Sequence, residues 1–230
     1  MAPDETACAE SSLAVGLGLE AAVAGSTCSF AVVVKDKTGA QRPAGGDVVV
    51  ARLIDRDSGR IAAEGHVLDN TDGSYHVSYV PTRCRDELLL RVTVNGQRLR
   101  GSPFRPRFVP GPVAGRCCTA SGAGLHDGVA GRPIEFELQA RDAFGNACDG
   151  GGGRFRMCAM MQTAACAEMR AGAAAVVRVE ARDDGDGTCA LAWSADVAGS
   201  YELAISWEHA VRRLRPRTIG LPDQPHPATH

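Results

Sequence analysis

The stretch Asp69-Asn-Thr-Asp-Gly-Ser-Tyr-His-Val-Ser-Tyr-Val-Pro-Thr82 joins a tight turn to a β-strand. Its Asp and Gly residues favour the turn, because Asp bonds nearby backbone N–H groups and Gly adopts positive φ without strain. The apolar residues Tyr75, Val77 and Tyr79 then alternate with polar or small residues. A period of two residues predicts a strand that buries one of its faces.

A second copy of this pattern lies in the C-terminal half of the chain. Asp183-Asp-Gly-Asp-Gly-Thr-Cys189 repeats the turn, and an alternating strand follows it. Further upstream, Gly16-Leu-Gly-Leu-Glu-Ala-Ala-Val-Ala-Gly25 corresponds to Gly122-Ala-Gly-Leu-His-Asp-Gly-Val-Ala-Gly131. The chain therefore holds two copies of one β domain, and its 230 residues are enough for two self-sufficient cores.

These motifs resemble the filamin (actin-binding protein) rod repeat. The resemblance rests on the Gly-x-Gly-Leu opening of both copies and on three further motifs, which are the run Asp69–Thr82, Gly101-Ser-Pro-Phe104 and Ala198-Gly-Ser-Tyr201. It implies an all-β fold of two tandem immunoglobulin-like sandwiches, each with seven strands. The sequence lacks the calponin-homology segment of filamins, so the resemblance does not imply direct actin binding.

Two departures from the family pattern concern local turns. Arg83-Cys-Arg-Asp-Glu87 stands where the family has Pro-Gly-x-Tyr, and Arg213-Leu-Arg-Pro216 replaces Gly-Ser-Pro-Phe in the second copy. The alternating strands continue on both sides of each departure. We therefore expect altered turn geometry within intact sandwiches.

The repeat boundaries divide the chain into successive parts. We expect a flexible N-terminus at residues 1–10, a first repeat at 11–110, a linker at 111–116, a second repeat at 117–219 and a Pro-rich disordered tail at 220–230. The second copy holds about eight extra residues, which places an insertion near residues 149–175. Its Met- and Ala-rich composition favours a short helix, and a lengthened loop between strands is the alternative.

Composition argues against several classes of protein. The formal net charge is −2, from 25 Lys and Arg against 27 Asp and Glu, whereas a nucleic-acid-binding domain is strongly basic. No apolar run reaches the roughly 18 residues of a membrane span, and the N-terminus lacks a secretory signal. We therefore expect a cytoplasmic protein without membrane insertion. Nine cysteines without C-x-x-C spacing indicate free thiols rather than a disulfide framework.

No motif for catalysis or for a cofactor occurs in the sequence. A nucleophile elbow, a phosphate loop and an H-E-x-x-H pair are missing, and the six histidines are scattered. The turn carboxylates have a spacing that resembles a calcium site, but the twelve-residue loop and its closing Glu are missing. We interpret them as turn residues and expect no enzyme activity, no cofactor and no metal. These carboxylates are Asp69, Asp72, Asp183, Asp184 and Asp186.

The first expected protein-binding surface is an open sheet edge. In filamin-type repeats the third strand borders such an edge, and a partner peptide adds there as an extra strand. The resemblance places this strand at Val48–Ile54 in the first copy and at residues 154–160 in the second. The apolar composition of Val48–Ile54 favours a covered edge, with either a partner or its own domain as the cover. The residues expected to contact a partner are Val48, Val50, Arg52, Ile54, Arg154, Arg156 and Cys158.

The second expected surface is a stripe of arginines near the last strand of each copy. Alternate arginines would lie on one strand face, where guanidinium groups bind carboxylates or phosphates in bidentate geometry. A solvated outer face of an edge strand is the alternative interpretation. The arginines are Arg98, Arg100, Arg105 and Arg107 in the first copy and Arg212, Arg213, Arg215 and Arg217 in the second.

These observations predict a non-enzymatic scaffold protein. Its two repeats would bind other proteins within a larger cytoskeletal or ciliary (axonemal) assembly, a setting in which repeats of the resembled type serve. The alternative function is that of an adaptor or substrate-recognition subunit in a ubiquitin-ligase or signalling complex, because single filamin-like domains also occur in such proteins.

Overall fold

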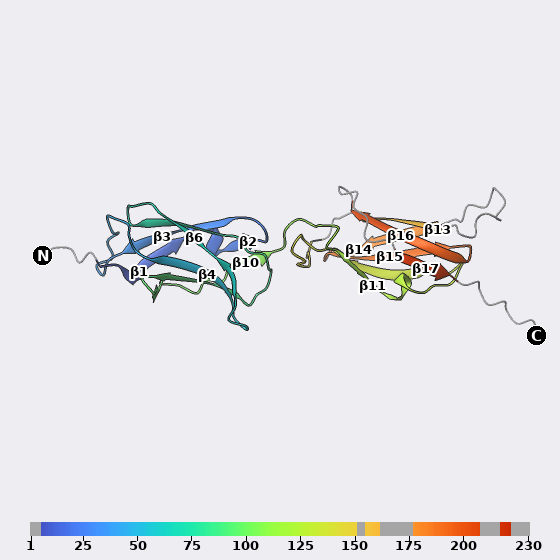
Figure 1. Ribbon diagram of the computed structural model, residues 1–230, viewed down its shortest axis with the longest axis horizontal. Helices are drawn as coiled ribbons and strands as arrows, with labels where there is room; N and C mark the ends of the chain where they lie inside the picture. Colours follow the sequence, from blue (N-terminus) through green and yellow to red (C-terminus); the bar gives the residue numbers. More distant parts are fainter. Residues whose placement is uncertain (1–5, 151–154, 162–176, 208–216, 222–230) are drawn as a thin grey trace, which may run out of the picture. The chain divides into compact units, whose positions relative to one another are not determined.

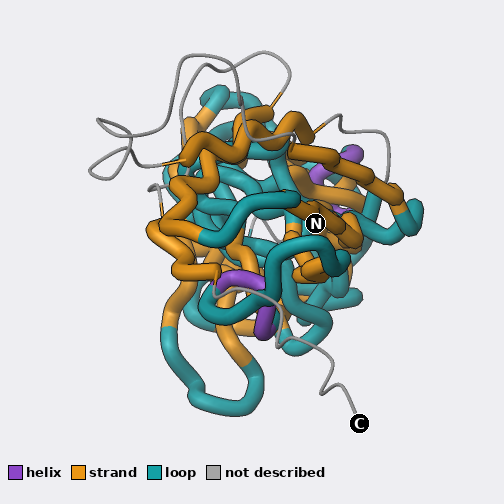
Figure 2. Tube along the Cα trace, turned by 90° about the vertical axis from the view of Figure 1, so that its right-hand side faces the viewer, coloured by secondary structure: helices purple, strands orange, loops and turns teal. Residues whose placement is uncertain are grey.

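The two copies form two compact units. A computed structural model describes residues 6–150, 155–161, 177–207 and 217–221, and the units divide between Gly111 and Pro112. Strands dominate the described residues, and Figure 2 shows short helical segments in purple. No helix among the described residues is long and apolar enough to cross a membrane. The all-β class expected from the sequence is confirmed.

Two four-stranded sheets form the sandwich of the first unit (Figure 1). One sheet has the order β1-β3-β7-β6, with bounds Cys8–Val15, Cys28–Lys35, Ser74–Tyr79 and His66–Asp69. The other has the order β5-β4-β8-β9, with bounds Ile61–Glu64, Val49–Asp55, Leu88–Val94 and Gln97–Arg98. The short strands β2 (Ala21–Val23) and β10 (Arg107–Val109) pair with each other in parallel.

The second unit repeats this arrangement. Its first sheet has the order β11-β12-β15-β14, with bounds Thr119–Ser121, Ile134–Gln139, Thr188–Ala195 and Val177–Asp183. Its second sheet has the described order β13-β16-β17, with bounds Phe155–Met161, Gly199–Trp207 and Arg217–Leu221. The 3₁₀ helices η1 (Leu17–Leu19) and η2 (Ala123–Leu125) lie at equivalent places in the two copies.

Alternating apolar side chains build each core. In the first unit, Val77 of β7 and Leu90 and Val92 of β8 are fully buried between the sheets. Burying one such side chain contributes about 1.5–3 kcal/mol. The intervening residues His76 and Arg91 are exposed. The period of two residues in the sequence therefore separates the core from the outer faces of the sandwich.

The Gly-x-Gly-Leu opening permits a close approach between two backbone segments. A Cβ atom at Gly18 would stand 2.6 Å from the carbonyl oxygen of Ser29, and one at Gly124 would stand 2.3 Å from that of Glu135. The Tyr79 hydroxyl donates a hydrogen bond of 2.6 Å to the Gly18 carbonyl oxygen. Glycine is therefore the residue that fits at this point in both copies.

The two copies close their cores differently near the starts of the equivalent strands β8 and β16. In the second unit, the Tyr201 hydroxyl donates to the Val197 carbonyl oxygen at 2.7 Å, and its ring packs 5.6 Å from that of Trp193. Burial raises the pKa of Tyr201. Leu88 occupies the equivalent place at the start of β8 and has no hydroxyl to make this bond. The departure seen in the sequence before Leu88 thus accompanies a different closure of the first core.

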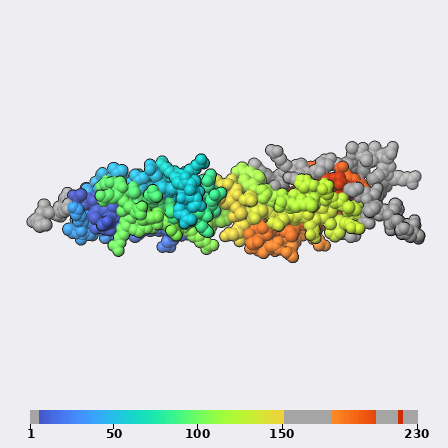
Figure 3. Space-filling view, turned by 90° about the horizontal axis from the view of Figure 1, so that it is seen from below, coloured from blue at the N-terminus to red at the C-terminus, as the bar shows by residue number. Residues whose placement is uncertain are grey.

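The first unit begins earlier than its sequence-based boundary at residue 11. The strand β1 starts at Cys8, because Ala9 is buried and its carbonyl oxygen accepts a hydrogen bond of 3.1 Å from the Arg100 N–H. In Figure 3 the blue start of this unit lies beside its green final segment. Residues 8–10 are therefore part of the sandwich rather than of a flexible N-terminus.

The segment expected to be a linker at 111–116 belongs to the second unit from Pro112 onward. Its Ala114 N–H donates to the Arg141 carbonyl oxygen at 2.8 Å, and Val113 forms a β-bridge with Asp142. Such contacts join residues far apart in the sequence, so composition alone does not reveal them.

The expected insertion near 149–175 is described only in part. Residues 155–161 form β13, so the Met-rich stretch starts as a strand. Residues 151–154 and 162–176, and most of the expected tail at 220–230, lie outside the described residues. The choice between helix and loop for the remainder of the insertion stays a prediction.

The close approach at the opening turn gives a test of this packing. We expect Gly124→Ala to lower the free energy of unfolding by about 1–3 kcal/mol, because the new methyl group must displace the backbone at Glu135. Gly220→Ala is the matched control, since a Cβ there meets nothing within 4 Å. Urea unfolding followed by circular dichroism measures both variants. Equal stabilities of the two variants would contradict the packing.

Candidate protein-binding surfaces

The outer edge of β4 is the first candidate surface. The strand pairs with β8 along its whole length, and β5 pairs with its other side from Arg52 to Ile54. The edge expected to be open is therefore covered over this part, because the chain turns back after Asp55 and forms a hairpin. Val48, just before β4, is 63% exposed. The chain's own domain thus covers the part of this edge from Arg52 to Ile54.

The covering strand β5 ends at Glu64, and the chain turns away from β4 at Gly65. The Gly65 N–H donates to the Ala51 carbonyl oxygen at 2.8 Å, and the chain beyond it pairs with β7 as β6. A Cβ atom at Gly65 would approach the Ala51 Cβ to 2.8 Å, which favours glycine at this crossing. Among the described strands, none is paired with the outer side of β4 at Val49 and Val50.

The strand β13 is the corresponding candidate in the second unit. It pairs with β16 over its full length, Phe155–Met161, and is the outer strand of the described sheet β13-β16-β17. The strand β14 pairs with β15 from Val177 to Asp183. Arg156 and Cys158, two residues of the expected edge, lie on β13, whereas Arg154 is outside the described residues. Within the described strands, the outer side of β13 is unpaired.

The expected arginine stripe of the first copy is exposed but does not follow one strand. Arg98 ends β9, Arg107 begins β10, and Arg100 and Arg105 lie in the irregular segment between them. The strand β9 is only two residues long, so these arginines cannot alternate along a single strand face. In the second copy Arg217 begins β17, and Arg212, Arg213 and Arg215 lie outside the described residues.

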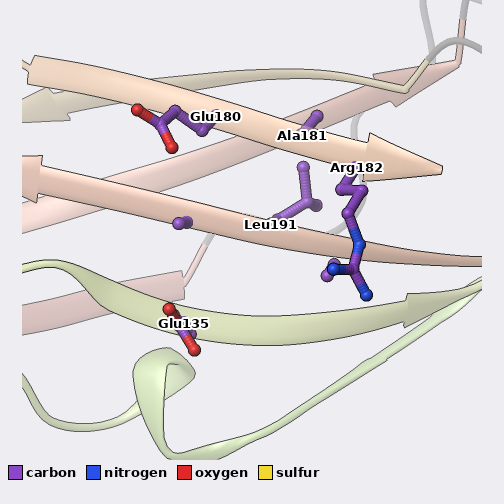
Figure 4. A pocket seen from close by; sticks show the side chains of 7 residues that line it. Glu135, Glu180, Ala181, Arg182 and Leu191 are labelled. Atoms are coloured by element: carbon purple, nitrogen blue, oxygen red, sulfur yellow. The ribbon is translucent and has the colours of Figure 1, made fainter. Parts of the chain in front are cut away.

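A hollow of about 420 Å³ lies on the outer face of the sheet that contains β12, β15 and β14 (Figure 4). Ala190 and Ala192 of β15 line it, and Ala192 lies between Glu135 and Glu180 on the neighbouring strands. Arg182 also lines it and pairs with Asp184 at 2.8 Å. The described lining contains two carboxylates and one guanidinium group, and no hydroxyl, thiol or imidazole group.

Comparison with known proteins identifies the family. The model of the Filamin/ABP280 repeat matches residues 6–105 and 112–211. The chain belongs to the Filamin/ABP280 repeat family. Each match lies within one of the two structural units, and the family's repeats mediate binding between proteins.

Among its relatives, this filamin-repeat chain is similar to tripartite motif proteins. It is 35% identical over 128 residues to the E3 ubiquitin-protein ligase TRIM71 of Xenopus tropicalis, a match that covers 52% of this chain and 15% of TRIM71. It is 34% identical over 129 residues to tripartite motif-containing protein 3 of Rattus norvegicus, covering 53% and 17% of the two chains. The filamin-repeat chain thus spans less than a fifth of the length of either relative.

A solved structure also shares the fold. The Escherichia coli adhesin FdeC matches with a TM-score of 0.53 and 16% sequence identity, over 94% of this chain and 66% of that chain. At this identity the likeness concerns the sandwich fold alone.

The turn carboxylates of the filamin repeats bind their own backbone. In the first repeat, Asp72 accepts hydrogen bonds from the Ser74 N–H at 2.9 Å and from its hydroxyl at 2.6 Å. In the second repeat, Asp186 accepts the same two bonds from Thr188. The hydroxyl bond, followed by the N–H bond, lowers the pKa of each carboxyl. Asp72 and Asp186 thus hold the backbone of their own turns. No group of three possible metal ligands occurs among the described residues.

Two further carboxylates were not singled out in the sequence. Asp36 and Asp142 are buried at equivalent turns of the two repeats. Asp36 accepts the N–H groups of Thr38 and Ala40 at 2.8 and 3.0 Å, and Asp142 accepts that of Phe144 at 2.9 Å. Asp36 follows β3 and Asp142 follows the equivalent strand β12. This recurrence in the sequence could have identified both residues. Because they bind the backbone of the turn, they have a structural role.

The lowered carboxyl pKa values predict how acid affects stability. A carboxylate with a lowered pKa in the folded state contributes stability above the ordinary value of about 4, and this contribution is lost as the pH falls through the lowered value. We therefore expect the urea midpoint to fall from pH 5 toward pH 3, and to fall less in the Asp72→Asn, Asp186→Asn double variant.

The matched control for this measurement is Asp86→Asn, which changes an exposed carboxylate outside these turns. It should retain the acid dependence of the unmodified chain. The assignment fails if the double variant and the unmodified chain lose stability in parallel.

Proposed function

We propose that the chain is a non-enzymatic protein-recognition module that captures an extended peptide by strand addition. The observation that carries this proposal is the position of β13 at the outer side of the sheet β13-β16-β17. An added strand would gain affinity from backbone hydrogen bonds and specificity from alternate side chains. Membership of a family of protein-binding repeats supports the same role.

The second repeat is the better receptor for such a peptide. In the first repeat β5 already occupies the edge of β4 from Arg52 to Ile54, so an incoming strand would have to displace it or bind only at Val49 and Val50. In the second repeat, the described strands leave the corresponding side of β13 unpaired. The two repeats would therefore differ in affinity for a peptide.

We further propose that this recognition serves a ubiquitin-ligase complex. The support is the similarity to a tripartite motif protein that is named as an E3 ubiquitin-protein ligase. In this setting the two repeats select the protein to be modified, and a segment or chain other than these repeats transfers ubiquitin. The cytoskeletal or ciliary scaffold expected from the sequence is the competing setting.

The strand-addition proposal can be tested by removing one backbone donor. In β4, the backbone N–H and C=O groups of Val49, Ala51 and Leu53 point away from β8. The hydrogen bond from the Gly65 N–H to the Ala51 carbonyl oxygen indicates this direction. The same register in β13 assigns Ala159 to that edge, because Ala159 pairs with Leu203 of β16 as Leu53 pairs with Leu90 of β8. Peptides of seven random residues, displayed on phage and selected on the chain, should bind Ala159→Pro at least about tenfold more weakly.

Ala159→Val is the matched control, because it keeps the N–H group and favours a strand. It should bind the selected peptides as the unmodified chain does. Circular dichroism establishes that each variant is folded. Peptides that bind a folded Ala159→Pro variant with unchanged affinity would dismiss this edge as the receptor.

The proposed setting has its own test. We expect the chain, isolated from cell extract after mild cross-linking, to recover ubiquitin-ligase subunits and ubiquitinated proteins, and Ala159→Pro to recover fewer of the ubiquitinated proteins. Mass spectrometry of the recovered proteins measures both. Recovery with a tubulin or actin filament fraction, without ligase subunits, would instead support the scaffold and reject the ligase setting.

A further inference from the structure

Two arginines lie directly opposite each other on the outer face of the first unit. Arg52 of β4 pairs with Arg91 of β8 in the antiparallel register, and both are exposed. Directly opposed side chains in such a sheet have Cβ atoms about 5 Å apart, and like charges at these positions destabilise the pair. Neither strand pairing nor core packing benefits from this juxtaposition.

The surrounding charges leave this face positive. Glu64 lies beside Arg52, with its carboxylate 3.3 Å from the guanidinium Nε, and the pair is largely exposed. Arg98 lies opposite Thr93, two positions from Arg91 on the same face of the sheet. This part of the sheet face therefore has three arginines and one carboxylate.

The positive charge is local rather than a property of the whole unit. Residues 1–111 contain thirteen Lys and Arg and thirteen Asp and Glu, so the first unit has no formal net charge. A nucleic-acid-binding domain is basic over a wider surface. The arginines are also flanked on the same face by half-buried apolar residues, which are Val50, Ile54 and Leu89. This mixture of charge and apolar surface is better suited to a peptide than to a phosphate backbone.

The second repeat shows that the fold does not require these charges. In its equivalent register Cys158 lies opposite Ala204, and the two strands still pair over seven residues. The arginine pair is therefore a property of the first repeat alone. A destabilising feature that the sandwich does not need points to a role in binding.

We propose that this surface, defined by Arg52, Arg91 and Arg98 with the apolar residues Val50, Ile54 and Leu89, binds an acidic segment of another protein. An Asp or Glu carboxylate of that segment would accept bidentate hydrogen bonds from the Arg91 guanidinium and relieve the repulsion between Arg91 and Arg52. Alternating apolar residues of the segment would contact the apolar side chains. The surface is a sheet face, so it does not depend on the edge of β13.

The test uses a defined probe on the full chain. A fluorescein-labelled peptide of alternating Glu and Val residues is titrated by fluorescence anisotropy at about 50 mM and about 300 mM salt. We expect Arg91→Glu to weaken binding at least about fivefold at low salt, and high salt to weaken binding by the unmodified chain. Arg83→Glu, which changes an exposed arginine in the segment before β8, is the matched control and should change affinity less than about twofold.

Stability separates a binding role from a structural one. Replacing Arg91 relieves the repulsion with Arg52, so Arg91→Glu and Arg91→Gln should melt at temperatures no lower than the unmodified chain. Arg91→Gln, which removes the charge without adding an acid, should also bind the peptide more weakly. Ala159→Pro should bind this peptide normally, so failure at one surface is distinguishable from failure at the other.

Three results would overturn the proposal. The first is equal peptide affinity in Arg91→Glu and Arg83→Glu. The second is unchanged affinity in Arg91→Gln. The third is tighter binding of a single-stranded oligonucleotide of matched charge than of the peptide, which would assign the surface to nucleic acid.

Discussion

The close approach of a glycine to a neighbouring backbone organises both sandwiches. At Gly18 and Gly124 the opening turn comes so near to the next strand that a methyl group would overlap its carbonyl oxygen. In the first unit the Tyr79 hydroxyl binds the carbonyl oxygen of this turn from inside the core. The strand β2 follows this turn and pairs with β10, the last strand of the unit in the sequence. The opening turn thus connects the core to the strand that closes the domain.

With the core fixed in this way, the outer faces of the strands can diverge. The two repeats bury apolar residues in the same alternating pattern, yet their exposed positions differ in chemistry. Arg52 and Arg91 face each other in the first repeat, whereas Cys158 and Ala204 face each other in the second. The outer face of the second unit has instead a hollow over Ala190 with glutamates beside it. One scaffold therefore carries outer faces of different chemistry in its two repeats.

The two proposed binding surfaces use different physical interactions. Strand addition at β13 depends on backbone hydrogen bonds, which any extended peptide can form, so its affinity is little affected by salt. Binding at the arginine face depends on charge at an exposed surface, where added salt screens the attraction. A partner that engages both surfaces would combine a sequence-tolerant contact with one that selects acidic residues.

The sequence by itself determined the class of fold, the repeat and the turns. These rest on local signals, since alternation at β7 and Asp-Gly turns such as that at Asp72 act through neighbouring residues. Only the tertiary structure decided that β5 covers part of β4, that β1 starts at Cys8 and that Arg52 lies opposite Arg91. Each of these depends on which distant residues pair across a sheet. Cross-strand register is set by long-range packing of the two sheets, and no short stretch of sequence contains it.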